Sequence, residues 1–174
     1  MNLSNLLSKL EKSQTYQDFH KENPDAFFCA AFLIMNLKQN TSENSLDFRD
    51  EKDIFSFKIL DNEIVLQKEL LIENPNQKPL EKIDEKKIGK LNVDIEDLQK
   101  SAEKELKKNK MENKLEEIIA VLQSDSNALV WSLTCMCAGF AIVSIKIDAL
   151  SGNILKFDKK NLLDFVSVKK PEKK

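Results

Sequence analysis

The sequence predicts an α+β fold in which a helix packs across an antiparallel β-sheet. Three observations carry this prediction: apolar residues at helical spacing over 95–110, strand-like runs over 117–123, 128–137 and 140–147, and a turn formed by DALSG at 148–152. We therefore expect an antiparallel sheet built largely from residues 115–157, with the helix over 95–110 packed across one of its faces. An N-terminal helix-plus-strands unit either continues this sheet or repeats it, which leaves two tandem helix-plus-sheet units open.

Composition sets the broad class of the protein. The 174 residues include 27 basic and 29 acidic residues, and the formal net charge is -2. This near-balance gives no global attraction for phosphate backbones or anionic lipid, so we expect neither a nucleic acid nor a membrane as a partner. With 41% hydrophobic residues the chain is also outside the composition of disordered proteins.

The cysteines and the N-terminus bear on the compartment. An odd count of 3 cysteines, with Cys29 far from Cys135 and Cys137, argues against a secreted disulfide framework. Residues 1–14 lack the pattern of a signal peptide. The longest apolar run, 26–35, is about half of the roughly 20 residues that a membrane-spanning helix needs. We expect a cytoplasmic protein without a membrane span.

The N-terminal part, residues 1–72, reads as a helix followed by strands. Leu3, Leu6, Leu7 and Leu10 share one helical face within residues 2–21, and Asn23-Pro24 ends the helix. The run 26–37 is apolar except at Asn36, which favours a strand buried on both faces, with a short helix as the alternative. Residues 38–45 read as a polar loop. The alternation over 54–60 and 63–67 then predicts a hairpin.

Residues 73–92 contain Pro75, Pro79 and mixed charge, and they read as a surface segment connecting two parts of the chain. The second part spans 93–168. Asp94 is a candidate N-cap for the helix over 95–110, whose apolar stripe is Ile95, Leu98, Ala102 and Leu106. After the three strand runs, residues 154–157 add a fourth strand and 162–168 an edge strand. A basic tail, 169–174, ends the sequence.

The turn over 148–157 carries a resemblance to a known family. Asp148, Ala149, Ser151, Gly152, Ile154 and Leu155 form a turn that, after a helix and a strand, resembles that of the PepSY domain over residues 94–157. The resemblance implies a PepSY/cystatin-like fold and a role in restraining a peptidase. PepSY domains are typically extracytoplasmic, and the sequence departs from that pattern because it shows no signal peptide, transmembrane helix or attached peptidase.

Two further similarities concern longer stretches. KENPDA, VWSLT and KIDALSGNIL are similar to segments of small uncharacterised archaeal proteins, which brings no known activity. Two segments within the chain are also similar to each other: Ser56–Ile59 with 63–66, and Ser144–Ile147 with 153–155. An internal repeat would produce this similarity, and so would the ordinary composition of β-hairpins.

Cysteine and histidine are the first candidates for chemistry. Cys135 and Cys137 are two apart, so in a strand both thiols point to the same face and could meet one soft metal ion. A structural zinc site needs about four ligands, and only Cys29 and His20 remain to complete it. Packing in a core is therefore the favoured interpretation of these cysteines. We expect no metal site.

The other candidates also have simpler structural explanations. Asp47, Asp50 and Glu51, and again Asp94, Glu96 and Asp97, are acids expected in loops and first helical turns. With one histidine, Cys-His or Ser-His-Asp catalysis could be built only around His20, and no phosphate-binding glycine motif occurs. Trp131 lies on the apolar face of its strand, which indicates a helix-covered core or, alternatively, an apolar pocket.

The sequence thus predicts a non-enzymatic, cytoplasmic protein-interaction or regulatory domain. A sheet edge can accept a partner strand, although the sequence identifies neither the protein partner nor the oligomeric state. The alternative is a small apolar-ligand-binding protein with a cavity between helix and sheet. We expect no catalytic residues, no cofactor-binding residues and no cofactor.

Overall fold

The computed structural model describes residues 2–61, 63–70 and 78–161. The described helices are α1 (Leu3–Glu11), α2 (Gln14–Glu22), α3 (Glu85–Ile88) and α4 (Leu98–Lys108), with a 3₁₀ turn η1 (Ile95–Asp97) before α4. The strands are β1 (Phe27–Asn36), β2 (Thr41–Arg49), β3 (Asp53–Ile59), β4 (Ile64–Leu70), β5 (Leu115–Asp125), β6 (Ala128–Cys137), β7 (Ala141–Asp148) and β8 (Ile154–Asn161).

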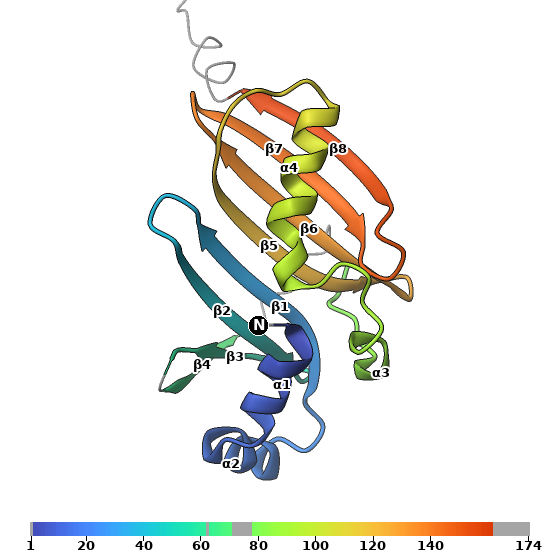
Figure 1. Cartoon of the computed structure of the whole chain (residues 1–174). Coiled ribbons are helices and arrows are strands. Elements are labelled where there is room, and N and C mark those ends of the chain that lie inside the picture. Colours follow the sequence, from blue (N-terminus) through green and yellow to red (C-terminus); the bar gives the residue numbers. More distant parts are fainter. Residues whose placement is uncertain (1, 62, 71–77, 162–174) are drawn as a thin grey trace, which may run out of the picture.

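All eight strands form one antiparallel sheet in the order β4-β3-β2-β1-β5-β6-β7-β8. The junction is the pairing of β1 with β5, which runs from Ala30 opposite Gln123 to Asn36 opposite Glu117. Figure 1 shows these two strands side by side near the middle of the molecule. A single sheet therefore runs through both parts of the chain.

This topology corrects the predicted fold class. The expected PepSY/cystatin-like fold, with a helix across an antiparallel sheet and two tandem units as an open variant, is wrong. The protein is mostly one eight-stranded sheet with a few short helices. The physical reason lies in the backbone edges of β1 and β5, which would each present unpaired N–H and C=O groups if the parts were separate. Their mutual pairing satisfies these groups.

Local sequence explains the N-terminal helices. Asn2 and Ser13 accept hydrogen bonds from the backbone N–H groups of Asn5 and Tyr16, and so cap α1 and α2. The predicted leucine face of α1 is confirmed, because Leu3, Leu6, Leu7 and Leu10 are all buried. The predicted helix over 2–21 is interrupted between α1 and α2, where Ser13 begins the second helix.

The first strands match the sequence in part. The continuous apolar run forms strand β1, which confirms the strand interpretation over the helical one. The loop predicted over 38–45 is wrong from Thr41 onward, since β2 begins there and Ser42 lies opposite Met35. The polar side chains of this part of β2 are largely exposed, so backbone pairing with β1 fixes the strand without an apolar pattern. The predicted hairpin is confirmed as β3 and β4.

The C-terminal strands and α4 follow the sequence closely. Asp94 and Asp97 form a capping box, after which α4 presents Leu98, Ala102 and Leu106 to the core. The strand runs are confirmed as β5, β6 and β7, and the fourth run belongs to β8. Ser126 and Asn127, with φ angles of 53° and 70°, make the tight turn between β5 and β6.

The turn between β7 and β8 is held against the segment before α4. Gly152 adopts a φ of 78°, and the N–H of Gly152 donates to the carbonyl of Asp148 at 2.8 Å. The N–H groups of Asn92 and Val93 both donate to the carbonyl of Ala149. The predicted need for glycine at this turn is confirmed.

Residues 78–92 include more than a surface connection. Ile83 and Ile88 are 0% and 3% exposed, and the N–H of Ile83 donates to the carbonyl of Phe28 at 2.9 Å. The remainder of the predicted connecting segment, 73–77, lies outside the described residues. So do the predicted edge strand over 162–168 and the tail over 169–174.

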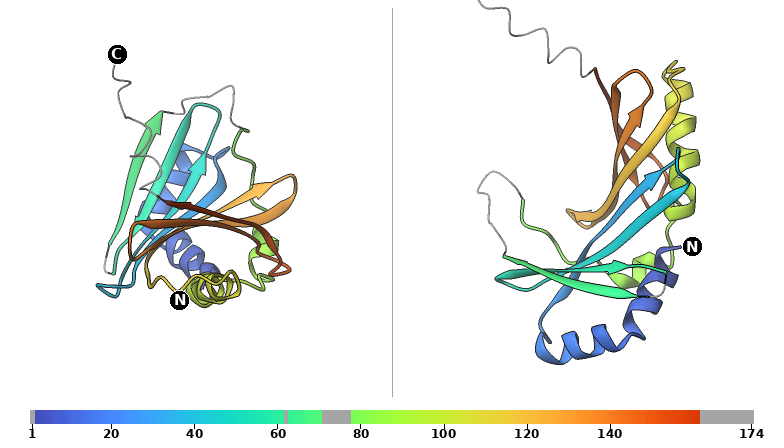
Figure 2. Two further views of the ribbon diagram at one scale, coloured as in Figure 1. Left: turned by 90° about the horizontal axis from the view of Figure 1, so that it is seen from above. Right: turned by 90° about the vertical axis from the view of Figure 1, so that its left-hand side faces the viewer.

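The helices and the sheet define two faces of the molecule. α1 and α2 lie against the first four strands and α4 lies against β5–β8, all on one face. Figure 2 shows that the sheet is strongly bent, with these helices outside the bend. The opposite face lines the inside of the bend and is called the open face below.

Candidate functional site

The open face has an apolar centre that crosses the β1–β5 junction. Phe32 lies opposite Val121 and Ile34 opposite Ile119 in the sheet register. These side chains are half-buried, whereas most of their neighbours in sequence on the helix side, such as Leu33 and Ala120, are buried. Two further half-buried residues on this face, Met136 and Ile142, lie opposite each other on β6 and β7. The six residues are called the apolar band: Phe32, Ile34, Ile119, Val121, Met136 and Ile142.

Polar side chains flank the band on the β2–β3 side. The hydroxyl of Ser56 donates to Asp47 Oδ1 at 2.5 Å, and Lys58 lies opposite Ser45. Desolvation by burial raises the pKa of the Asp47 carboxyl, and the nearby Glu69 adds to this effect, while hydrogen bonds from Ser56 and Ser45 oppose it. Asp47 is thus a shielded acid whose partner on this face is a serine.

A second polar region lies on the β6–β7 side. Thr134 is opposite Ser144, and Ser132 is opposite the exposed Lys146. All four side chains belong to the open face by strand alternation. Hydroxyl groups and a lysine therefore border the apolar band, as in protein interfaces with an apolar core and a polar rim.

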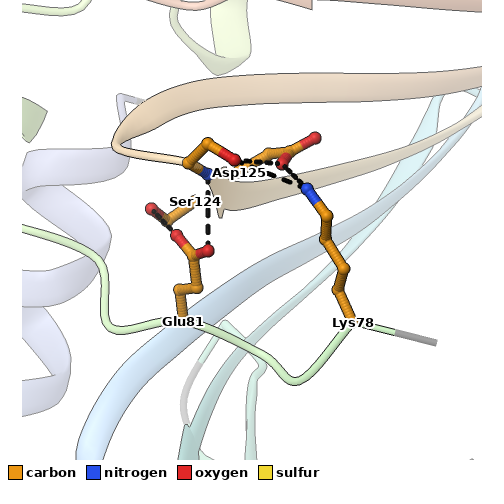
Figure 3. A network of polar contacts seen from close by, with 5 residues as sticks. Lys78, Glu81, Ser124 and Asp125 are labelled. Atoms are coloured by element: carbon orange, nitrogen blue, oxygen red, sulfur yellow. Dashed lines mark hydrogen bonds and ion pairs between the residues drawn. The ribbon is translucent and has the colours of Figure 1, made fainter. Parts of the chain in front are cut away.

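The segment 78–81 borders one end of the open face, at the β5–β6 turn. Figure 3 shows Lys78 reaching Asp125, with Nζ and Oδ1 2.8 Å apart, and Glu81 accepting from the hydroxyl of Ser124 at 3.0 Å. This segment and the adjacent strand residues, including Val130, enclose a small cavity of about 120 Å³. The segment limits the open face on this side.

The structure places the three cysteines in the core. Cys135 and Cys137 lie on the same, helix-covered face, which confirms their predicted packing role, and both are at most 4% exposed. Cys29 is fully buried and its thiol lies 3.3 Å from the carbonyl oxygen of Asp47. Burial raises the pKa of Cys29 and of Cys135 to about 12. These thiols are therefore protonated near neutral pH.

His20 does not join the cysteines. It lies exposed in the last turn of α2, with its ring stacked on that of Tyr16 at 5.9 Å between centroids. Within the residues that the structure describes, no group of three or more His, Cys, Asp or Glu side chains could hold a metal ion.

The expected loop position is wrong for Asp47, which lies within strand β2. Asp50 and Asp94, in contrast, occupy turn and capping positions. Asp50 accepts from the N–H groups of Lys52 and Asp53, and these bonds lower the pKa of its carboxyl. Asp94 Oδ1 accepts from Ile95 N and also from Leu3 N at 2.9 Å, so one carboxylate serves two helical segments. These are structural roles.

Trp131 is a core residue. Its side chain is 0% exposed, and Nε1 donates to the carbonyl of Val93 at 2.9 Å. The indole thus packs on the helix side and fixes the segment before α4. Of the two interpretations of Trp131, the structure supports the helix-covered core.

Sequence reasoning missed the open face as a site, although a signal was present. The run 26–37, apolar except at Asn36, predicted a strand buried on both faces. The run 118–122 is apolar as well. The second apolar face is instead only half-buried, at Phe32, Ile34 and Ile119. An uninterrupted apolar run on a strand with one open face marks a candidate contact surface.

The comparisons with known proteins bear on the fold. No family model matches the chain, and a search of curated proteins found no match. The crystal structure of a putative lipoprotein from Clostridium difficile 630 is similar, with a TM-score of 0.54 and 18% identity over 84% of this chain and 90% of that one. At this identity the likeness shows the fold alone. Among the described residues, no helix has the length and apolar character needed to cross a bilayer.

Proposed function

We propose that the chain is a non-enzymatic protein-interaction domain that binds a partner on the open face of its sheet. The observation that carries the proposal is the apolar band, which crosses the β1–β5 junction and lies on the face opposite the helices. Exposed apolar surface with a polar border is typical of protein contact sites. A partner that covers this band would remove its remaining apolar area from water.

The resemblance of residues 94–157 to PepSY makes a peptidase the first class of partner to test. A peptidase offers an extended substrate-binding cleft, and a segment or loop bordering such a cleft could seat on the concave open face. Ser132, Thr134 and Ser144 would then supply hydrogen-bond donors and acceptors beside the band.

The apolar-ligand alternative has no comparable support. Its cavity was expected between helix and sheet, yet Leu98, Ala102 and Trp131, which meet there, are each 0% exposed. Side chains fill this interface within the described part of the chain.

The test is recovery of a partner from a lysate of the source cells by immobilised protein. Ile119→Glu places a charge in the apolar band, and Lys100→Gln makes the same change in net charge on the exposed side of α4. We expect wild type and Lys100→Gln to retain the same partner and Ile119→Glu to lose it. The proposal would be wrong if repeated experiments recovered neither a partner nor an oligomer. It would also be wrong if Ile119→Glu, with its fold shown to be intact by circular dichroism, recovered the partner as well as wild type does.

A further inference from the structure

The turn between β6 and β7 is apolar and exposed. It consists of Ala138, Gly139 and Phe140, and the Phe140 side chain is 70% exposed. The turn at the other end of β6 is polar, with Ser126 and Asn127 between β5 and β6. Turns at a protein surface usually carry polar or small residues, so an aromatic ring at this tip is of no benefit to solubility.

The backbone at this tip does not favour phenylalanine either. Phe140 has a φ of 62°, in the left-handed region, directly after Gly139 at 79°. A bulky residue is strained in this conformation, and glycine or asparagine would be accommodated better. Folding therefore gives no reason for an exposed phenylalanine here, whereas contact with an apolar phase does.

Lysines surround the tip. The tip is fastened to the segment after α4, since the N–H of Ala138 donates to the carbonyl of Lys114 at 2.8 Å and Asn113 Nδ2 donates to the carbonyl of Ala138 at 2.9 Å. On the other side, Lys160 lies opposite Ile142 and Lys159 opposite Val143.

The C-terminal ends of α4 and β8 meet at this end of the molecule, at the top of Figure 1. An open groove beside α4 adds Lys107 and Lys110 to the surface next to Lys114. All these lysine side chains are exposed, and Glu112 is the exposed acid among them. The local charge is therefore positive, although the whole chain has a net charge of -2.

We propose that this end docks on the surface of an anionic lipid bilayer. The surface is named the basic tip and consists of Phe140 with Lys110, Lys114, Lys159 and Lys160. An aromatic ring enters the boundary between headgroups and acyl chains, while lysines near it are attracted to anionic headgroups.

Docking on a bilayer explains both the exposed phenylalanine and the lysines around it. An exposed aromatic side chain surrounded by lysines is complementary to a bilayer with an anionic surface and an apolar layer beneath it. The sequence-based expectation of no membrane partner rested on the absence of a spanning segment and of net positive charge, and surface docking requires neither. The basic tip borders the open face at Lys160, which lies opposite Ile142 of the apolar band.

Co-sedimentation of the full chain with vesicles tests the proposal. The vesicles contain phosphatidylcholine alone or mixed equally with phosphatidylglycerol. We expect binding to the mixed vesicles only, and loss of binding in about 1 M salt, where the Debye length is about 3 Å. Phe140→Ala should weaken partitioning roughly tenfold through lost apolar burial, and the pair Lys110→Glu and Lys114→Glu roughly a hundredfold.

Matched controls lie away from the basic tip, at the start of β8 and near α3. Leu155→Ala removes an apolar side chain that is 54% exposed at the start of β8. The pair Lys86→Glu and Lys90→Glu makes the same change in net charge near α3. Both controls should bind like wild type. Equal binding to the two kinds of vesicle, no binding at all, or unchanged binding by Phe140→Ala would each overturn the proposal.

Discussion

The two halves of the sheet, β1–β4 and β5–β8, bury different kinds of side chain beneath their helices. The first half has an aromatic cluster: Tyr16, Phe19, Phe48, Phe55 and Phe57 lie ring to ring, with Phe19 and Phe57 5.0 Å apart. The second half buries aliphatic residues such as Leu133 and Ile145, with Trp131 as its one tryptophan. Aromatic rings fill more volume per residue, so two nine-residue helices can close the first half.

The outer edges differ as well. β4 leaves Leu66 and Leu70 exposed at 36% and 79% and carries one exposed lysine, Lys68, while β8 presents three, Lys156, Lys159 and Lys160. Lysines discourage another strand from pairing with an edge. The first half thus concentrates its stability in a few large side chains and has fewer lysines on its edge strand.

The largest expected effect is in the aromatic cluster. Phe57 is 0% exposed and lies within 6 Å of the rings of Phe19, Phe48 and Tyr16, so Phe57→Ala should lower the free energy of unfolding by about 4 kcal/mol. Leu133→Ala, in the aliphatic half, should cost about 3 kcal/mol. Urea denaturation measures both. A larger loss from Leu133→Ala would contradict the contrast between the halves.

A smaller effect is expected where the halves are tied together. Asp94 Oδ1 accepts from Leu3 N in α1 and from Ile95 N before α4, so Asp94→Ala should cost about 1–2 kcal/mol. Asn2→Ala removes only the cap of α1, through Asn5 N, and should cost about 1 kcal/mol or less. Thermal unfolding of the two variants compares them. A smaller loss for Asp94→Ala would show that Asp94 does not link the halves.

The smallest expected effect concerns the shielded acid of the first half. The folded-state pKa of Asp47 is raised, so folding favours its protonated form, and stability from this group falls as pH rises from the unfolded-state pKa to the folded one. Asp47→Asn should therefore slightly stabilise the protein at neutral pH and remove this part of the pH dependence. Denaturation at mildly acidic and neutral pH measures it. A loss of stability at neutral pH would show that the carboxylate charge is needed.

The sequence predicted most elements and, as one of two alternatives, that the N-terminal unit continues the sheet. It did not predict which strands pair to join the two parts. The stripe of α4, the alternation in β3 and the DALSG turn depend on local spacing, and all three were correct. The pairing of β1 with β5 joins residues far apart in the chain and leaves no local pattern. For the same reason, the polar start of β2 at Thr41 was missed.

In the candidate site, too, features set by local sequence were predicted and features set by tertiary packing were not. The apolar run in β1 indicated two apolar faces, and the cysteines and Trp131 were correctly interpreted as packing residues. Which face the helices leave uncovered depends on tertiary packing, so the apolar band could not be found from one strand at a time. The basic tip likewise joins lysines from α4 and β8 with a turn between them.

The most direct test of the central claim is labelling of introduced cysteines with and without the partner. Burial raises the pKa of the native thiols Cys29, Cys135 and Cys137, so a maleimide should react selectively with a new thiol on the surface. Thr134→Cys reports on the open face beside the apolar band, and Lys100→Cys reports on the exposed side of α4. Binding of the partner recovered by the wild-type protein should slow labelling at position 134 and leave position 100 unchanged. Slower labelling at position 100 alone would contradict binding on the open face.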